Sequence, residues 1–442
     1  MLIHLSLENF KIWKATGPIR LAPVTLFLGT NSSGKSSLIQ ALLLIRQTVK
    51  GGDDNQDLNL GNPDAGDSVA LGQYKDMLCR FGSSTRVGIE FRWSASGEPA
   101  SSTIFSARYR RGPAGGAELD YLRLGKDDEG FIVERRLPEI YRLFLGSERK
   151  SRGQSINFRP RRSFAFSPAV LDRLGNDADP IREVGPQLLD ELSRIIYLGP
   201  VRRLAQRDYV WSGRMPASIG DDGGKAVDAL IASGLSLQKA RKRDRTAPHE
   251  ATLFQETVRW LKEMDLADDL SVKSLGGSSR YELLLHREGE MSNLKDVGVG
   301  VSQVLPVIVA ALHAEPGHIV IVEEPESHLH PQAESLLAEL FVTVSKERNV
   351  QFIVETHSEH LFRRMQTLLA KGETDPQNCA MYFVEREGKE AKLRELVPDT
   401  VGRIKNWPPK FFGDTLGETR IQAELAIQHI KEARAKSGDV SD

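Results

Sequence analysis

Apolar and polar side chains alternate along much of the N-terminal third of the chain. Residues 2–7 alternate, a turn follows at residues 9–11, and an apolar run returns at residues 19–28. Residues 87–93 also alternate, and residues 103–134 continue the pattern between glycine-rich turns. A period of two is typical of strands with one buried face. The pattern predicts an antiparallel lobe within residues 1–134.

The pattern then changes twice. From about residue 135 to residue 274 it favours helices and loops, and after residue 275 strand and helix patterns return. The returning segments are Tyr281 to His286, Val304 to Leu312, Ile319 to Val322 and Gln351 to Val354. We therefore predict an α/β domain with a mixed central sheet. It is formed by residues 1–134 and 275–400, and is interrupted by a largely helical subdomain at 135–274 and followed by a tail at 401–442.

A glycine-rich turn lies between an apolar run and an amphipathic helix pattern. Val24 to Leu28 leads into this turn, and a helix-forming run follows at residues 38–45. Strand, glycine loop, Lys-Ser and helix together are the context of a phosphate-binding loop. Such a loop holds phosphates with backbone N–H groups at a helix N-terminus, and its serine binds Mg²⁺. The candidate phosphate-binding residues are Gly29, Asn31, Ser32, Ser33, Gly34, Lys35, Ser36 and Ser37.

Two adjacent carboxylates end a second apolar run, almost three hundred residues later. Ile319 to Val322 is followed by Glu323 and Glu324. One acid would hold the metal and the other would activate water, as in other phosphate-binding-loop enzymes. A solvated charge pair at a strand end is the alternative for this segment alone. Together with the loop, the pair predicts binding of ATP with Mg²⁺, and ATP hydrolysis.

Composition narrows the class of protein. The chain has 442 residues, 40% hydrophobic residues and a formal net charge of −1, so no global field attracts it to nucleic acid. Its two cysteines, Cys79 and Cys379, lack nearby metal-ligand partners, which favours a reducing compartment. The longest apolar stretch, Val304 to Leu312, is too short to span a bilayer. We expect a cytoplasmic protein that makes no membrane contact.

Two further segments extend the candidate site. Gly300, Ser302 and Gln303 belong to a glycine-rich turn that opens an apolar helix, where N–H and O–H donors can face an anion. A simple cap of a core helix is the alternative. His357 follows the apolar run at residues 351–354, where a neighbouring parallel strand would place it beside a γ-phosphate.

The order and spacing of these motifs resemble those of the ABC-type ATPases, in the soluble branch that contains the SMC, RecF and overcoming-lysogenization-defect (OLD) proteins. The motifs with this resemblance lie at residues 5–11, 29–37 and 323–331. Further similarity, to a stand-alone bacterial family found in phage-defence operons, is carried by Tyr197-Leu198-Gly199-Pro200-x-Arg202, Tyr209-x-x-Ser212-Gly213 and Trp407-Pro408-x-x-Phe411-Phe412.

The resemblance implies a role for each matching residue. Gly34, Lys35 and Ser36 would hold the phosphates and Mg²⁺, and Glu323 would belong to the Mg²⁺ shell. Glu324 would be the general base and His357 would contact the γ-phosphate.

The resemblance also implies that Ser302 and Gly300 contact the nucleotide of a second subunit, which predicts an ATP-dependent dimer or higher oligomer. The turn departs from the family pattern because Gln303 and Val304 replace two glycines. Gln73 is the candidate for the family's Mg²⁺-sensing glutamine, with an ordinary loop glutamine as the alternative.

OLD proteins fuse this ATPase to a nuclease of the topoisomerase–primase type. The nearest matching acids here, Asp177 and Asp179, follow a polar turn rather than a strand. We therefore expect no nuclease in this chain. We expect instead that the ATPase controls a separate effector, for example a nuclease of this type. A nucleotide-gated scaffold with incidental turnover and a RecF-like repair ATPase are the alternatives.

Positive charge is concentrated in the expected subdomain. Residues 135–162 contain nine Arg or Lys against two Glu, and Arg241, Lys242, Arg243 and Arg245 form a second cluster. Such patches can bind DNA by releasing counterions. A solvated arginine face or a dock for an acidic partner is the alternative. Residues 416–436 predict a terminal helix.

Overall fold

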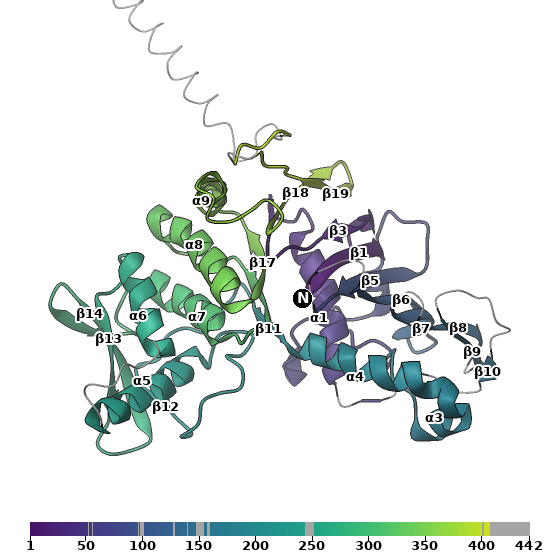
Figure 1. The fold of residues 1–442 in the computed structure, drawn as a ribbon, viewed down its shortest axis with the longest axis horizontal. Helices are drawn as coiled ribbons and strands as arrows, with labels where there is room; N and C mark the ends of the chain where they lie inside the picture. Colours follow the sequence, from purple (N-terminus) through teal and green to yellow (C-terminus); the bar gives the residue numbers. More distant parts are fainter. Residues whose placement is uncertain are drawn as a thin grey trace, which may run out of the picture.

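A computed structural model describes most of the chain. The described residues are 1–51, 53–54, 56–95, 97, 101–126, 129–138, 140–146, 154–156, 160–243, 252–399 and 402–406. Figure 1 shows two halves that meet at a central sheet, with antiparallel strands on one side and most of the helices on the other. None of the described helices is long and apolar enough to cross a membrane.

The central sheet has six strands. Their order is β11 (Ile195–Leu198), β16 (Ile319–Glu323), β17 (Gln351–Thr356), β4 (Val24–Gly29), β18 (Cys379–Glu387) and β19 (Glu390–Glu395). The first five strands run parallel, and β19 is antiparallel to β18. Because parallel strands end at the same edge, loops from distant parts of the sequence meet there.

A second, antiparallel sheet contains most of the N-terminal strands. Its path is β10 (Gln154–Ile156), β9 (Ile140–Leu145), β8 (Phe131–Leu137), β7 (Ala117–Gly125), β6 (Thr103–Arg111), β5 (Val87–Trp93), β1 (Leu2–Phe10) and β2 (Trp13–Ala15), and β3 (Ile19–Arg20) also pairs with β1. The expected antiparallel lobe is therefore present.

Helices flank the sheets (Figure 1). They are α1 (Lys35–Lys50), α2 (Tyr74–Met77), α3 (Pro168–Leu174), α4 (Asp179–Ser193), α5 (Ala226–Arg243), α6 (Leu253–Glu263), α7 (Val299–His313), α8 (Pro331–Arg348) and α9 (Glu359–Ala370). Of these, α1, α4 and α5 to α9 pack on the two faces of the central sheet. A small third sheet contains β12 (Tyr209–Val210), β13 (Asp269–Ser274), β14 (Arg280–Arg287) and β15 (Glu290–Asn293).

The central sheet is buried on both faces, which explains its continuous apolar runs. Along β4, Val24, Leu26 and Leu28 face one hydrophobic core, whereas Phe27 faces the other. The first core is shared with α5 to α9, and the second with α1, α4 and the antiparallel sheet. Alternate side chains of the same strands thus join the two halves of the molecule.

The expected subdomain boundary at residues 134 and 135 is wrong. It falls inside β8, and the antiparallel sheet continues through β9 and β10. The cause is the composition of these strands: Arg135, Arg136 and Arg142 interrupt the apolar alternation. Glu134 and Arg142 are cross-strand neighbours in this extension of the sheet.

The other boundaries of the expected subdomain also need correction. β11, within residues 135–274, is a strand of the central sheet, and β13 and β14 form a hairpin across residues 274 and 275. A four-residue apolar run such as 195–198 has too little periodicity to be identified as a strand. Of the expected tail, only residues 402–406 are described, so the motif at 407–412 and the expected helix at 416–436 lie outside the described residues.

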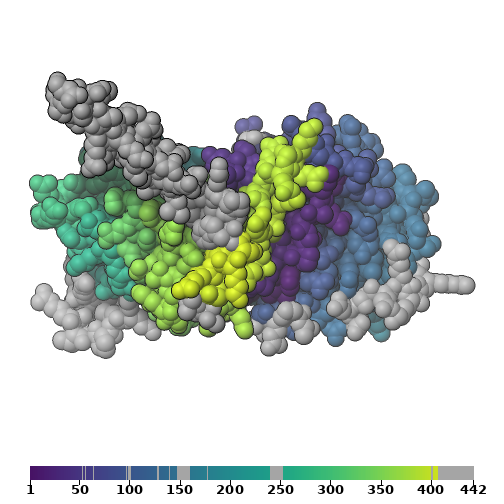
Figure 2. Space-filling model, turned by 90° about the horizontal axis from the view of Figure 1, so that it is seen from above, coloured from purple at the N-terminus to yellow at the C-terminus, as the bar shows by residue number. Residues whose placement is uncertain are grey.

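The C-terminal strands bridge the two halves. Figure 2 shows the yellow-green segment that includes β18 and β19 lying across the surface between the green and purple parts of the molecule. β18 pairs with β4 along its length, from Cys379 opposite Val24 to Val384 opposite Gly29. Consequently, the end of β18 lies directly beside the start of the glycine-rich turn.

Candidate nucleotide-binding site

The glycine-rich turn connects β4 to α1 at the carboxyl edge of the central sheet. Gly29 has a φ of 148°, and a Cβ atom at this position would lie 2.1 Å from the carbonyl oxygen of Val384. Only glycine fits this position, because both the conformation and the close approach exclude a side chain. α1 begins at Lys35, so its free N–H groups face the turn.

Lys35 and Trp13 hold the turn in shape. The Lys35 ammonium donates to the carbonyl oxygens of Gly29 at 3.1 Å and Thr30 at 3.0 Å. The Trp13 indole N–H donates to the carbonyl oxygen of Gly34 at 3.1 Å. Ser33 lies inside the turn, and its buried hydroxyl has no hydrogen-bond partner. The turn is thus closed around a lysine and retains an unused polar group.

The paired acids reach the same edge from β16. Glu323 is the last residue of β16 and lies opposite Glu355 of β17. Glu323 Oε1 accepts a hydrogen bond from the Tyr197 hydroxyl at 2.7 Å. The Ser36 hydroxyl donates to Glu355 Oε1 at 2.9 Å, and Lys35 Nζ lies 3.8 Å from the same oxygen. The structure therefore brings Lys35, Ser36 and Glu323 together, as predicted, and adds Glu355.

Burial shifts the pKa values of these charged groups. It raises the pKa of Glu355 to about 8, with a further contribution from the charge of Glu323. The pKa of Glu323 is also raised by burial, against the hydrogen bond from Tyr197. The pKa of Lys35 is lowered by burial, although Glu355 opposes this effect. The site is a low-dielectric environment in which a bound cation or anion would interact strongly.

Glu324 occupies a backbone conformation that few non-glycine residues adopt. Its φ is 46°, which costs about 1 kcal/mol or more, and such strain concentrates at functional sites. Its N–H donates to the carbonyl oxygen of Glu355 at 2.8 Å, and its carboxylate accepts from the Ser327 hydroxyl at 3.2 Å. These contacts turn the Glu324 side chain away from the path of β16.

A buried arginine fixes the backbone of both acids. Arg202 is 4% exposed, and its Nη2 donates to the carbonyl oxygens of Glu323 at 2.6 Å and Glu324 at 3.0 Å. Burial lowers the pKa of Arg202 to about 10, against the nearby acids. Tyr197 and Arg202 thus give a structural role to the Tyr-x-Gly-Pro-x-Arg motif, which lies at the end of β11.

His357 lies beside the turn as expected. Its N–H donates to Glu326 Oε1 at 2.6 Å, and α9 begins two residues later. Burial and the charge of Lys35 lower the pKa of its imidazole, whereas Glu324 and a hydrogen bond with the backbone of Gly29 oppose this. His357 follows the end of β17, the strand between β4 and β16, so its backbone lies at the same edge as the turn and the paired acids.

The second glycine-rich turn lies at the start of α7. A Cβ atom at Gly300 would lie 2.5 Å from the carbonyl oxygen of His328, so this turn packs against the loop that follows the paired acids. The Ser302 hydroxyl donates to the carbonyl oxygen of Val299 at 2.8 Å, and Gln303 is buried. Within one chain, therefore, Ser302 bonds within its own helix.

Gln73 lies apart from these residues. It precedes α2, where its N–H donates to the Asp76 carboxylate at 3.0 Å. It also lines a pocket with residues 56–62 and 112–118, none of which belongs to the glycine-rich turn or the paired acids. The structure gives Gln73 the position of a helix-capping residue rather than a place beside Ser36.

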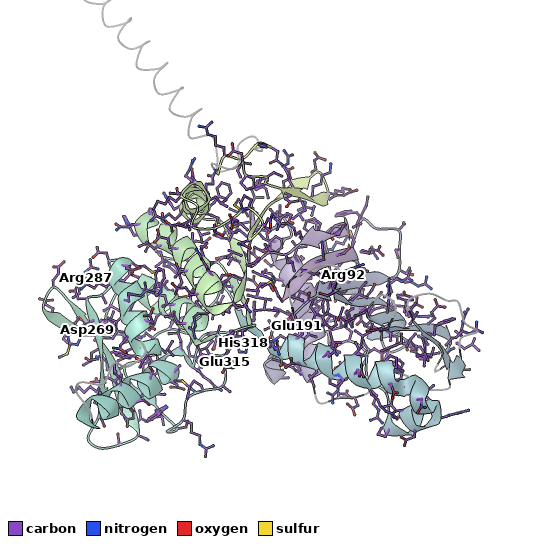
Figure 3. All side chains as sticks on the ribbon, viewed as in Figure 1. Arg92, Glu191, Asp269, Arg287, Glu315 and His318 are labelled. Atoms are coloured by element: carbon purple, nitrogen blue, oxygen red, sulfur yellow. The ribbon has the colours of Figure 1, made fainter. Side chains whose placement is uncertain are left out.

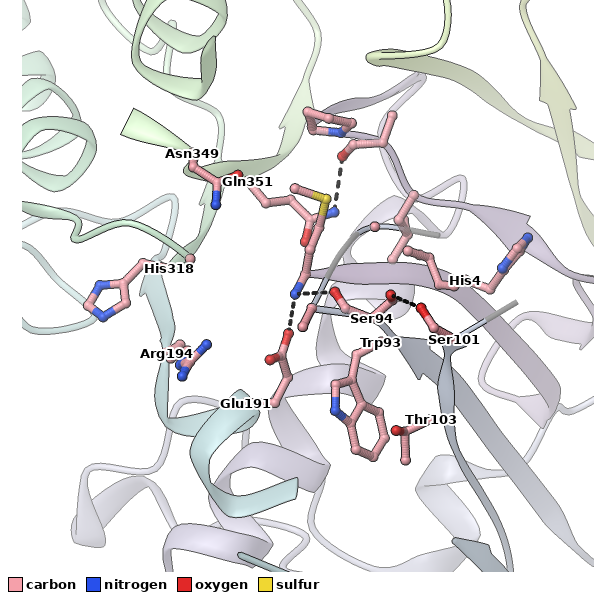
Figure 4. Close-up of a pocket in the computed structure, with 18 of the residues that line it drawn as sticks. His4, Trp93, Ser94, Ser101, Thr103, Glu191, Arg194, His318, Asn349 and Gln351 are labelled. Atoms are coloured by element: carbon pink, nitrogen blue, oxygen red, sulfur yellow. Dashed lines mark hydrogen bonds and ion pairs between the residues drawn. The ribbon is translucent and has the colours of Figure 1, made fainter. Parts of the chain in front are cut away.

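A large cavity lies at the opposite, amino edge of the central sheet. It has a volume of about 1270 Å³, and its lining includes Pro23, His318, Gln351 and Asn378, which precede or begin the parallel strands. Figure 3 shows His318 and Glu191 near the middle of the molecule, where the two halves meet. Figure 4 shows that Glu191 and Ser94 hold the amino nitrogen of Met1 in this cavity.

Comparison with known proteins identifies the family. Residues 24–363, from the start of β4 into α9, match the family model described as "AAA domain, putative AbiEii toxin, Type IV TA system". Residues 375–422 match a second model, described as "Protein of unknown function (DUF3696)". No match was found among curated proteins.

Similar solved structures are heads of SMC proteins. An SMC head bound to the C-winged helix domain of ScpA is 14% identical, with 90% of this chain and 97% of that chain covered and a TM-score of 0.47. The SMC head domain from Thermotoga maritima is 13% identical, with 89% and 98% covered and a TM-score of 0.42.

A third similar structure is the Smc head domain with an extended coiled coil bound to the C-terminal domain of ScpA, derived from Pyrococcus furiosus. It is 13% identical, with 98% of this chain and 99% of that chain covered and a TM-score of 0.47. The match to the AAA-domain model spans more than half of the sequence and confirms the resemblance to ATPases indicated by the motifs. The chain belongs to this family of AAA-type ATPase domains.

Proposed function

We propose that this chain binds ATP with Mg²⁺ at the carboxyl edge of its central sheet and hydrolyses it. The main support is the convergence of Lys35 and Ser36 with the strand-end acids of β16 and β17, which are about three hundred residues away in sequence. The N–H groups at the start of α1 and the Lys35 ammonium provide donors for phosphate oxygens. The family assignment points to the same chemistry.

The oxygen-rich composition of the site suits Mg²⁺. No three His, Cys, Asp or Glu side chains cluster as a metal site in the part of the chain that the structure describes. Mg²⁺ needs no such cluster, because it usually keeps several waters and is held by one or two carboxylates and substrate phosphates. Ser36 and Glu323 would hold the metal, which would neutralise charge on the transferred phosphoryl group.

The strained acid provides the hydrolytic group. Glu324 would accept a proton from the attacking water, because it directly follows the end of β16 at the carboxyl edge of the sheet, next to Glu323. His357, beside Gly29 and Glu324, would contact the γ-phosphate. Arg202 would keep Glu323 and Glu324 in their relative positions by its hydrogen bonds to both carbonyl oxygens.

We further propose an ATP-dependent dimer or higher oligomer in which Ser302 and Gly300 complete the site of a neighbouring subunit. Val299, the first residue of α7 and part of this turn, is 46% exposed. An apolar side chain exposed beside the turn is available to a protein partner.

The ATPase cycle would control a separate effector, for example a topoisomerase–primase-type nuclease, in anti-phage defence of a prokaryote. The support is the likeness of the motifs to a defence-associated family, together with a family model whose description names a toxin of a toxin–antitoxin system. Closure around ATP would present a different surface to the effector than the open state does.

Binding of DNA by the basic segment has less support. Arg135 forms an ion pair with Glu118, and Arg161 and Arg162 both contact Asp54. Partnered guanidinium groups are less available to release counterions from DNA. Arg245 lies outside the described residues, as do the side chains of Arg241, Lys242 and Arg243.

The variant Glu324→Gln separates the ATPase from a nucleotide-gated scaffold. It should lower ATP turnover by about 10²- to 10⁴-fold while retaining nucleotide binding, because the amide keeps the shape but cannot accept the proton. The assembly should then accumulate in its closed state, which size-exclusion chromatography with ATP would detect.

Whether the Glu324→Gln protein still activates the effector decides between control by hydrolysis and the scaffold. Loss of activation in an assembled Glu324→Gln protein supports control by hydrolysis, and full activation supports the scaffold. The matched control is Glu191→Gln, a buried acid at the opposite edge of the sheet, which should leave turnover unchanged.

A further inference from the structure

Glu355 is a buried acid to which the motifs assign no role. It is the second-last residue of β17, the strand that lies between β4 and β16. Its register partners are Phe27 on one side and Glu323 on the other. The sheet therefore places the Glu355 carboxylate between the phosphate-binding loop and the first of the paired acids.

The two oxygen atoms of Glu355 have different surroundings. Oε1 accepts the hydrogen bond from the Ser36 hydroxyl at 2.9 Å and lies 3.8 Å from Lys35 Nζ. Oε2 is buried and has no hydrogen-bond donor, and the residue as a whole is only 4% exposed. A buried carboxylate oxygen without a donor is costly unless a ligand uses it.

In the hydrogen bond between Ser36 and Glu355, the Ser36 hydroxyl is the donor. When the hydroxyl gives its proton to Glu355, the lone pairs of Ser36 Oγ face away from that proton and are free to bind a cation. Glu355 Oε1 accepts from the Ser36 hydroxyl, and Glu323 Oε1 accepts from the Tyr197 hydroxyl, so Glu355 is an acceptor that orients Ser36. Such outer partners fix the geometry of the groups that bind a metal directly.

We propose that Glu355 is part of the site that binds nucleotide-associated Mg²⁺. Through Oε1 it orients the Ser36 hydroxyl, and through Oε2 it adds a second carboxylate oxygen beside Glu323. This assignment rests on the proposed ATPase function and names a residue of the same site. A purely structural role, in which Glu355 only pairs with Lys35, is the competing explanation.

Metal affinity distinguishes the two roles. Affinity for Mn²⁺, used as a probe for Mg²⁺, would be measured by electron paramagnetic resonance on the full chain saturated with a non-hydrolysable ATP analogue. We expect Glu355→Gln to weaken Mn²⁺ binding about 10- to 100-fold, the range for loss of an outer metal-site partner. Affinity for the same analogue in EDTA should change less than about twofold, since Lys35 and the loop remain.

Glu355→Asp and Glu191→Gln complete the experiment. Glu355→Asp retains the charge but withdraws the carboxylate by one methylene, so an intermediate loss of Mn²⁺ affinity is expected, and this variant serves if Glu355→Gln does not fold. Glu191→Gln, a buried acid at the far edge, should bind Mn²⁺ as the wild type does.

The outcomes separate this assignment from the proposed function. Wild-type protein that binds neither the analogue nor Mn²⁺ would contradict the ATPase itself. Wild-type protein that binds both, with Glu355 variants of unchanged Mn²⁺ affinity, would overturn the role of Glu355 alone. If the Glu355 variants lost affinity for the analogue in EDTA as strongly as they lost affinity for Mn²⁺, the role of Glu355 would also be overturned, in favour of the structural role.

Discussion

The two edges of the central sheet are built in different ways. At the amino edge, the Gln351 side chain accepts from the N–H of Leu2 and donates to the carbonyl oxygens of Leu2 and Ala22, all within 3.0 Å. At the carboxyl edge, Glu355 Oε2 and the Ser33 hydroxyl are buried without partners, and Glu324 has a left-handed backbone. The amino edge contains a large cavity, whereas the carboxyl edge contains a strained backbone and buried polar groups without partners.

The difference distinguishes a cavity whose polar groups are already bonded to the protein from an edge where some buried polar groups are not. The cavity at the amino edge is lined by groups such as Gln351 and Glu191 that already bond to the protein itself. At the carboxyl edge, buried polar groups lack hydrogen-bond partners within the protein, so a ligand would be needed to provide them. We therefore assign a structural role to the amino edge and a catalytic role to the carboxyl edge.

The largest effect on stability is expected at the amino edge, from Gln351→Ala. The change would leave the N–H and carbonyl groups that Gln351 satisfies without partners in a buried region. We expect the free energy of unfolding to fall by about 2–4 kcal/mol, measured by urea unfolding, with ATP affinity of the folded protein unchanged. If the Gln351→Ala protein bound ATP more weakly even under conditions where all of it is folded, the structural role assigned to the amino edge would be contradicted.

A smaller effect is expected at the carboxyl edge, from Arg202→Lys. Lysine keeps the charge but lacks the planar guanidinium group, whose Nη2 atom makes both hydrogen bonds, so it would hold the carbonyl oxygens of Glu323 and Glu324 less well. We expect kcat for ATP to fall about tenfold with little change in KM, because the position of Glu324 matters mainly for the hydrolytic step.

The control for Arg202→Lys is Arg203→Lys, the adjacent exposed arginine, which pairs with Asp222 at 2.9 Å. Steady-state kinetics should show no change for it. If both variants lost the same activity, the hydrogen bonds of Arg202 to the two acids would have no specific role.

The smallest expected change is in the stability of the nucleotide-free protein, and it has opposite signs at the two edges. Glu355→Gln should stabilise the nucleotide-free protein by about 1 kcal/mol, because it removes one of two facing buried carboxylates, and functional sites are often built at a cost in stability. Glu191→Gln should destabilise it, because it removes the ion pair with the amino group of Met1 at 2.6 Å. Differential scanning calorimetry would show the two shifts, and equal signs would contradict the comparison.

The sequence predicted the parts of the site that lie in local motifs. Strand, glycine turn, Lys35 and helix are contiguous, so their relation needs no knowledge of the rest of the fold. Glu323 and Glu324 follow a strand that is apolar on both faces, which marks the edge of a buried parallel sheet. The resemblance then supplied the roles of His357 and Ser302, of which the structure places His357 beside the turn.

Contacts between distant segments could not be read from the sequence. Glu355 stands two residues before His357, and its significance depends on β17 lying between β4 and β16. Tyr197 and Arg202 were part of a recognised motif, but their partners are more than 120 residues away. A search for polar residues at the ends of all buried strands would have found Glu355, since the carboxyl ends of parallel strands meet.

Nucleotide titration of the purified full chain is the most direct test of an ATP site at the carboxyl edge of the central sheet. In isothermal titration calorimetry with Mg²⁺ and the non-hydrolysable analogue, the account predicts saturable binding of one nucleotide per chain. It also predicts loss of this binding in Lys35→Ala, whose ammonium lies on the glycine-rich turn. No saturable binding by the wild type, or equal binding by a folded Lys35→Ala protein, would contradict the assignment of the carboxyl edge as the ATP site.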